Sequence, residues 1–262
     1  MVLVVAAVAA CSRDDGGGGA DSAASAAPGY EPAAASAAPI AATRYAVAPL
    51  GQVGRVRGTV EVVGTIPPDS VVRPISDQEV CGDSLVDVTV EQSGGKLAGA
   101  VVWLAGVKSG KRPPMNRRYE MDIEGCQMSP RTQAAFVGGT LNVHNADRVQ
   151  HRTRFVRQGS REPVAIVPYS DEGQLVPVTT ALARPGVVEA RCDLHPWGRA
   201  WVAVFDHPYF AVTSPIGEFA LDSVPPGKYT LLAWHPRLGV VRDTVRVGGA
   251  EERAVVLRMT VR

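Results

Sequence analysis

A cysteine and a histidine lie three residues apart near the end of the chain, at Cys192 and His195, with Pro196 and Trp197 directly after them. Apolar runs typical of strands flank this segment, so both side chains are expected on a short turn between strands. A thiolate and an imidazole at this spacing supply two ligands to one metal ion. A second histidine from elsewhere in the fold would complete the trigonal His2Cys set that suits copper. The residue types therefore predict a mononuclear copper site.

The length and composition of the chain indicate the kind of fold that would hold this site. A chain of 262 residues allows one or two domains, and its net charge of +1 gives no electrostatic footprint for nucleic acid. The hydrophobic content of 45% supports buried cores, and the 27 glycines and 20 prolines indicate many turns. We therefore expect an all-β fold.

Short β-rich runs alternate with turn residues from position 55 onward, at separations of roughly 8–12 residues that favour a sandwich over β-α-β units. The expected strands are 55–63, 97–104, 119–123, 134–143, 187–192, 200–205, 209–212, 218–221, 229–235, 240–247 and 254–261.

The first eleven residues form an apolar run that ends at Cys11, and this run resembles a bacterial lipoprotein signal. The resemblance implies that Cys11 carries lipid, and that the protein is anchored to a membrane in the periplasm or cell envelope. Residues 12–53, rich in Ala, Gly, Ser and Pro, would be a disordered linker. The alternative is an apolar tail with an incidental cysteine.

Two cysteines remain once Cys11 is assigned to lipid and Cys192 to metal. Exported proteins tend to pair such residues, so we expect a disulfide between Cys81 and Cys126. Two buried free thiols are the alternative.

The last part of the chain resembles a carboxypeptidase regulatory-like domain, a small transthyretin-like β-sandwich, in its runs 217–221 (GEFAL) and 224–231 (VPPGKYTL). The first strands of such a domain appear far upstream, at 58–60 (GTV) and 99–101 (GAV). The resemblance thus implies a split sandwich, 54–114 and 208–262, with a domain inserted at 115–207. Two domains in tandem remain the alternative.

Residues 115–207 resemble a cupredoxin of the amicyanin and plastocyanin branch, through the segments 139–151 (GTLNVHNADRVQH) and 185–197 (PGVVEARCDLHPW). His151 follows Asn145 by six residues, as the first ligand histidine of that family does, and lies 41 residues before Cys192. The resemblance implies a Greek-key β-sandwich that holds one type 1-like copper ion through His151, Cys192 and His195.

The same resemblance assigns supporting roles. The Asn145 side chain would bridge the two ligand loops by hydrogen bonds. Pro196 and Trp197 would shield the edge of His195 and leave an apolar patch as the port for electrons.

The chain departs from the family at two positions. Gly198 stands where the amicyanin-like pattern has its axial methionine, and Arg152 stands where an asparagine is expected. The axial ligand is therefore unknown. Met121 and Met128 are distant candidates, but nothing in their spacing favours them. A trigonal site can bind copper with a weak or absent axial bond.

The other histidines are assigned no metal. His144 alternates with the apolar residues of its strand and should face solvent, whereas His207 and His235 precede prolines and should be structural.

Five arginines crowd the first ligand histidine. They form either an ordinary solvated loop or a docking rim for an acidic redox partner, such as a cytochrome or dehydrogenase. These are Arg148, Arg152, Arg154, Arg157 and Arg161.

Motifs for phosphate loops, dinucleotide binding, zinc proteolysis and nucleophile elbows are absent from the sequence, so we expect no enzyme. The expected function is a copper-binding envelope protein that carries single electrons. The alternatives are a metal-free structural or binding protein with a degenerate cupredoxin fold, and a copper storage or delivery protein.

Overall fold

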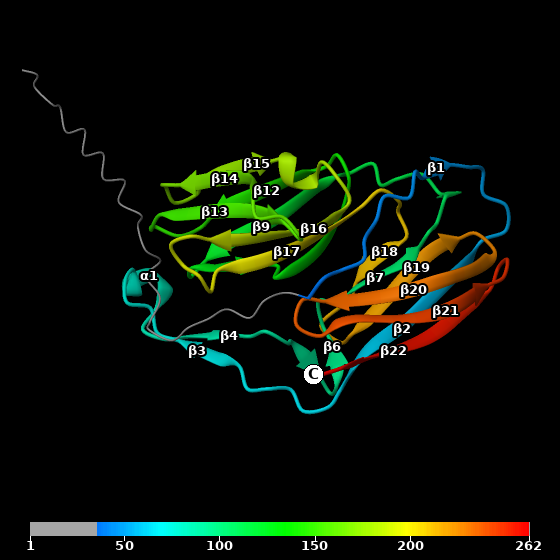
Figure 1. The fold of residues 1–262 in the computed structure, drawn as a ribbon, viewed down its shortest axis with the longest axis horizontal. Helices are drawn as coiled ribbons and strands as arrows, with labels where there is room; N and C mark the ends of the chain where they lie inside the picture. The colour runs from blue at the N-terminus through cyan, green and yellow to red at the C-terminus, as the bar shows by residue number, and fades with distance from the viewer. Residues whose placement is uncertain (1–35, 262) are drawn as a thin grey trace, which may run out of the picture.

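The computed structural model describes residues 36–261, which fold into two β-sandwiches that lie side by side (Figure 1). This architecture confirms the predicted all-β fold class. No helix in the described range has the length and apolar character needed to cross a membrane. Cys11, predicted to carry lipid, lies outside the described residues.

The sandwich that contains the predicted metal ligands, here called the site sandwich, has two sheets of strand order β10-β9-β12-β15 and β11-β17-β16-β13-β14. Its elements are β9 (Arg118–Glu124), β10 (Gln127–Ser129), β11 (Thr132–Phe136), β12 (Thr140–Asn145), β13 (His151–Arg157), β14 (Pro163–Tyr169), β15 (Leu175–Val178), the 3-10 helix η1 (Thr180–Leu182), β16 (Gly186–Cys192) and β17 (Arg199–Phe205).

The second sandwich, here called the companion sandwich, has sheets of order β18-β7-β20-β21 and β19-β2-β6-β5, with β22 also paired to β2. Its elements are β2 (Gly54–Val63), β5 (Gln92–Ser93), β6 (Lys96–Leu97), β7 (Val101–Ala105), β18 (Phe210–Val212), β19 (Glu218–Val224), β20 (Gly227–His235), β21 (Gly239–Val247) and β22 (Glu252–Thr260). The chain thus starts the companion sandwich, builds the site sandwich, and returns to finish the first.

Four sheets stack in series, with an apolar layer between each neighbouring pair. The outer layers are the cores of the two sandwiches, and the middle layer packs β17 and β16 of one against β7 and β20 of the other. Every residue of β17 is buried, because Ala200 and Val202 face the site core while Trp201 and Phe205 face the companion sandwich. Burial on both faces explains why this strand reads as a continuous apolar run.

A small excursion leaves the companion sandwich between β2 and β5 and lies at the end of the site sandwich (Figure 1). It consists of β3 (Ser70–Val72), the one-turn helix α1 (Gln78–Cys81) and β4 (Leu85–Asp87), and β3 pairs with β4. We call residues 70–87 the cap.

The described end of the predicted linker differs from the expectation of disorder. Ser36 accepts hydrogen bonds from the Trp234 indole (3.0 Å) and the Gln158 amide (2.6 Å), which belong to different sandwiches. Thr43 bonds to the carboxylate of Asp206, and β1 (Ala46–Val47) pairs with β8 (Ser109–Gly110). Residues 36–48 are therefore an ordered segment, here called the strap, that is hydrogen-bonded to both sandwiches. The amino-acid composition of this segment does not reveal these bonds.

Candidate metal centre

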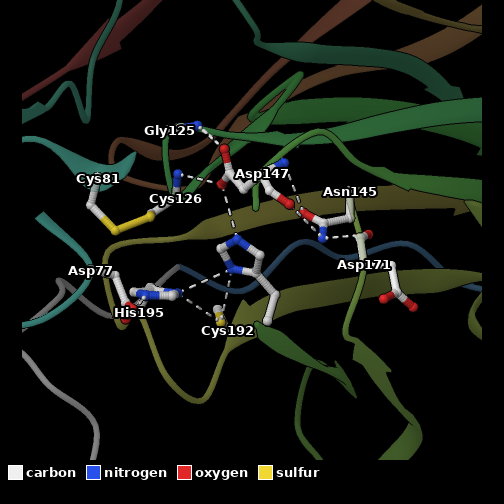
Figure 2. A network of polar contacts seen from close by, with 10 residues as sticks. Asp77, Cys81, Gly125, Cys126, Asn145, Asp147, Asp171, Cys192 and His195 are labelled. Atoms are coloured by element: carbon white, nitrogen blue, oxygen red, sulfur yellow. Dashed lines mark hydrogen bonds and ion pairs between the residues drawn. A yellow bond between two sulfur atoms is a disulfide. The ribbon is translucent and has the colours of Figure 1, made fainter. Parts of the chain in front are cut away.

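Three buried donor atoms converge at one end of the site sandwich (Figure 2). The Cys192 sulfur lies 3.7 Å from Nδ1 of His151 and 3.6 Å from Nδ1 of His195, and the two Nδ1 atoms are 3.0 Å apart. His151 opens β13, Cys192 closes β16, and His195 lies on the turn between β16 and β17. The structure thus brings together all three residues that the sequence assigned to the metal.

The turn from Cys192 to Gly198 holds its two ligands by backbone hydrogen bonds. The Cys192 N–H donates to the Gly198 carbonyl (2.9 Å), and the Gly198 N–H donates to the His195 carbonyl (2.8 Å). On the other side, Thr153 of β13 pairs with Cys192, so the strand that carries His151 is in register with the cysteine. Ladder bonds therefore fix the relative positions of the ligands.

Each imidazole is anchored by a carboxylate through its outer nitrogen. Nε2 of His151 lies 2.9 Å from Oδ2 of Asp147, and Nε2 of His195 lies 3.2 Å from Oδ2 of Asp77. A carboxylate only accepts, so the protonated nitrogen of each neutral ring is Nε2, and Nδ1 presents its lone pair to the centre. Two lone pairs 3.0 Å apart repel one another unless a cation or a proton lies beside them. The arrangement calls for positive charge at this point.

Backbone groups hold the Asp147 carboxylate in place. It accepts hydrogen bonds from the N–H groups of Gly125 (2.7 Å) and Cys126 (2.8 Å) as well as from His151. Burial alone would raise the pKa of Asp147, but these hydrogen bonds outweigh it and lower the pKa. Asp147 is thus kept ionised, as an acceptor for the ligand imidazole must be.

Without metal, a proton takes the place of the cation. Burial lowers the pKa of His151, but bonds to Asp147 and Cys192 outweigh it and raise the pKa to about 9. Burial raises the pKa of the Cys192 thiol, but its contacts with both histidines outweigh that and lower the pKa to about 6. The cysteine is therefore set up as a thiolate, the form that binds metals.

The donor set fits a copper ion. A first-row ion bonded to two nitrogens at about 2.0–2.1 Å and a sulfur at about 2.3 Å separates those donors by roughly 3–4 Å, which matches the 3.0, 3.6 and 3.7 Å found here. A thiolate with two imidazoles in a trigonal arrangement is the set that copper electron-transfer sites use. The residues present would hold the metal that the sequence predicted.

The axial position stays without an assigned ligand. A Cβ atom built at Gly198 would lie 2.9 Å from the carbonyl oxygen of Cys126 and 3.1 Å from that of His195. Backbone atoms therefore occupy the space that a methionine at this position would need. Met121 and Met128 lie in the same buried apolar cluster as Cys192.

Asn145 supports the site differently from what the resemblance implied. Its amide donates to the carbonyls of Asp147 (3.1 Å) and Asp171 (3.0 Å), and its side-chain oxygen accepts from the Asp147 N–H (3.1 Å). These bonds do not reach the Cys192–His195 turn. Asn145 instead shapes the turn that presents Asp147 to His151.

The predicted electron port beside His195 is not found as expected. Trp197 is fully buried, with its ring 5.5 Å from the His195 ring, and Pro196 is half-buried. His195 itself is 0% exposed, because the cap covers it. No pattern in the sequence indicates that a segment far upstream lies over His195.

Cys81 and Cys126 form a disulfide that joins the cap to the site sandwich. Sequence reasoning missed Asp147 and Asp77. Asp147 lies four residues before His151 in a chain segment already singled out, so a search for carboxylates near the ligands could have found it. Asp77 is 118 residues from His195, and no local pattern connects the two.

The remaining histidines are engaged elsewhere. His144 is 40% exposed at its side chain and faces Asp122. His207 and His235 are buried, and each accepts a backbone N–H at Nδ1, from Tyr209 and Arg237 respectively.

Most of the arginine cluster has partners within the protein. Arg152 and Arg154 both bond to Asp193, and Arg148 pairs with Glu172. Arg157 donates to the carbonyls of residues 181, 184 and 185. The cluster is thus less positive than its residue count suggests.

Comparison with known proteins returns structural neighbours only, as no protein-family model and no curated sequence matches the chain. One neighbour is a copper-containing nitrite reductase from Thermus scotoductus SA-01, at 20% identity and a TM-score of 0.31, covering 39% of this chain and 25% of that one. A purple cupredoxin from Nitrosopumilus maritimus aligns at 20% identity and a TM-score of 0.27, over 33% of this chain and 98% of its own. A reduced amicyanin mutant aligns at 24% identity and a TM-score of 0.27, over 33% and 81%. These neighbours are cupredoxins or contain copper, but at such TM-scores the function proposed below rests on the geometry of this chain alone.

Proposed function

We propose that this chain binds one copper ion through His151, Cys192 and His195 and carries single electrons. The observation that supports this best is the convergence of three buried donor atoms while both outer imidazole nitrogens are held by carboxylates. Bound copper would supply a one-electron couple.

The protein's own part is to keep the donors still. His151 and Cys192 lie on paired strands, and the backbone bonds of the turn hold His195. Copper(I) and copper(II) prefer different geometries, so a scaffold that allows little rearrangement favours fast exchange of one electron. Burial of the donors also keeps water from the site.

The absorption spectrum of the copper(II)-loaded protein tests the proposal. We expect an intense thiolate-to-copper band in the visible region, lost in Cys192→Ser and retained in His144→Ala, which removes a solvent-facing histidine instead. Zinc-loaded protein, which has no such transition, serves as the metal control. A copper-loaded wild type without the band would overturn the proposal.

Copper delivery is the competing function, and it requires exchangeable copper(I) rather than a reversible couple. Voltammetry decides between the two. A reversible one-electron wave supports the carrier, whereas rapid loss of copper(I) to a competing chelator supports delivery.

We further propose that the protein works at the cell envelope, held by lipid at Cys11, and exchanges electrons with a partner redox protein. The Cys81–Cys126 disulfide supports an oxidising compartment. Membrane fractionation of wild type and Cys11→Ser tests the anchor, and recovery of both in the soluble fraction would contradict it.

A further inference from the structure

The cap covers the ligand histidine at the edge of the site. His195 has no exposed surface, although it lies on a turn, and its outer nitrogen meets Asp77 of the cap. The Asp77 side chain is 40% exposed, so its carboxylate lies at the boundary between the buried site and solvent. The carboxylate of Asp77, in a segment that leaves the companion sandwich, therefore contacts Nε2 of a histidine in the site sandwich (Figure 2).

The backbone at Asp77 is specialised for this placement. Asp77 has a φ of 56°, in the left-handed region, and its carbonyl accepts the N–H groups of Val80 (3.0 Å) and Cys81 (2.8 Å) to start the single turn of α1. A residue other than glycine rarely adopts this conformation. The main chain thus builds the helix while the side chain points away from it, toward His195.

The disulfide ties this turn to the other carboxylate. Cys81 lies four residues after Asp77 and is bonded to Cys126, whose own N–H donates to Asp147 at 2.8 Å. Both sulfurs of this bridge lie close to His195: the two Sγ atoms and a ring nitrogen of His195 are all within 4.8 Å of one another. Val72, Leu85 and Trp197 pack around the bridge. A single covalent link therefore joins the supports of both ligand histidines.

We propose that Asp77 is a positioning residue of the metal centre, which fixes the tautomer and orientation of His195, and that the Cys81–Cys126 disulfide holds it there. This inference rests on the proposed function. A carboxylate acceptor on the outer nitrogen strengthens the imidazole as a donor. Asp77 then favours copper(II), the more charged state, over copper(I).

The midpoint potential of the copper-loaded protein measures this role. Loss of such an outer partner weakens metal affinity by about 10–100-fold. If copper(II) affinity alone falls by that factor in Asp77→Asn, the potential rises by about 60–120 mV, at 59 mV per tenfold change for one electron. Asp77→Glu should restore part of the shift. Asp83→Asn, which removes the same charge from an exposed position of the cap, should leave the potential near that of wild type.

The part played by the disulfide is tested by a double-mutant cycle. The variant with Cys81→Ala and Cys126→Ala should raise the potential as Asp77→Asn does, and the three changes together should add little, because both act through one contact. Fully additive shifts would show that the disulfide does not act through Asp77. An unchanged potential in Asp77→Asn would overturn the inference.

A readout without metal is also available. Cys192 is buried, and its sulfur lies 3.6 Å from the ring of His195, which the cap contacts, so alkylation at this thiol in the metal-free protein, followed by peptide mass spectrometry, should be slow. Loss of the disulfide should raise the rate of alkylation several-fold, and an equal rate would contradict the proposed holding role of the disulfide.

The two proposals fail in different ways. If copper-loaded wild type lacks the thiolate-to-copper band, the proposed function fails. If the band forms but the midpoint potential is unchanged in Asp77→Asn, only this inference fails.

Discussion

Asp147 is the side chain that anchors the outer nitrogen of His151, the first of the two candidate ligand histidines. It accepts the His151 proton and is itself fixed by two backbone N–H groups. In Asp147→Asn the amide cannot accept as strongly as a carboxylate, and it brings N–H groups against the backbone donors. We expect copper(II) affinity to fall about 10–100-fold, measured by competition with a chelator.

Asp122→Asn is the matched control for that change. Asp122 contacts the exposed His144 and has no bond to a ligand histidine among its described contacts. Its loss should leave copper affinity unchanged, and an equal fall in both variants would show a general effect of negative charge instead.

Two buried histidines make the fold sensitive to acid. Burial lowers the pKa of His207 to about 4, although the nearby Asp206 opposes the shift. Burial, together with the charges of Arg237 and Arg131, also lowers the pKa of His235 to about 4. The unfolded chain binds these protons near pH 6.5, so stability is complete above that pH and falls as the pH drops toward 4. The loss is on the order of a few kcal/mol.

Urea unfolding of the metal-free protein at pH 7.5 and pH 5 measures this dependence. The variant His235→Gln keeps an acceptor for the Arg237 N–H but does not titrate, so it should lose less stability over the same interval. If variant and wild type lose the same amount, the source of the acid sensitivity is elsewhere, in the carboxylates.

At the scale of elements, the β16–β17 turn leaves no room for the methionine that the family pattern places at Gly198. A side chain there would press on two carbonyl oxygens. We expect Gly198→Met to destabilise the metal-free protein by about 1–3 kcal/mol and to leave the copper without a methionine ligand. Denaturant unfolding and the absorption spectrum measure the two effects.

Gly51→Met is the control for added bulk, since nothing lies within 4 Å of a Cβ at that position. Its stability should stay close to that of wild type. A Gly198→Met protein of normal stability with an altered copper spectrum would show that the turn can open to admit the new side chain.

The same elements show how far sequence reasoning reaches. Cys192 and His195 could be paired because a short turn keeps near neighbours in sequence near in space, whereas His151 was assigned to the same site only through the resemblance to cupredoxins. The cap could not be foreseen, because β3, α1 and β4 are too short to leave a periodic pattern. Asp77 reaches His195 only through the disulfide and the packing of the cap, which are properties of the assembled fold.

At the scale of the whole molecule, the middle apolar layer makes the two sandwiches one unit. Trp103 and Trp234 of the companion sandwich share that layer with Trp201 and Phe205 of the site sandwich. Because such a layer resembles a core rather than a polar domain contact, we expect calorimetry to show one cooperative transition, with equal calorimetric and van't Hoff enthalpies. Two resolved transitions would contradict this expectation.

The order in which the strands are made has a consequence for biosynthesis. β2 emerges early and pairs with β6 at Glu61 and Lys96, but its longer pairings, with β19 and β22, form only after the whole site sandwich has been made. A nascent chain that ends at residue 205 can therefore complete the site sandwich, while most of the length of β2 stays unpaired and open to pairing with other chains. A growing polypeptide of this kind needs protection until its last strand has left the ribosome.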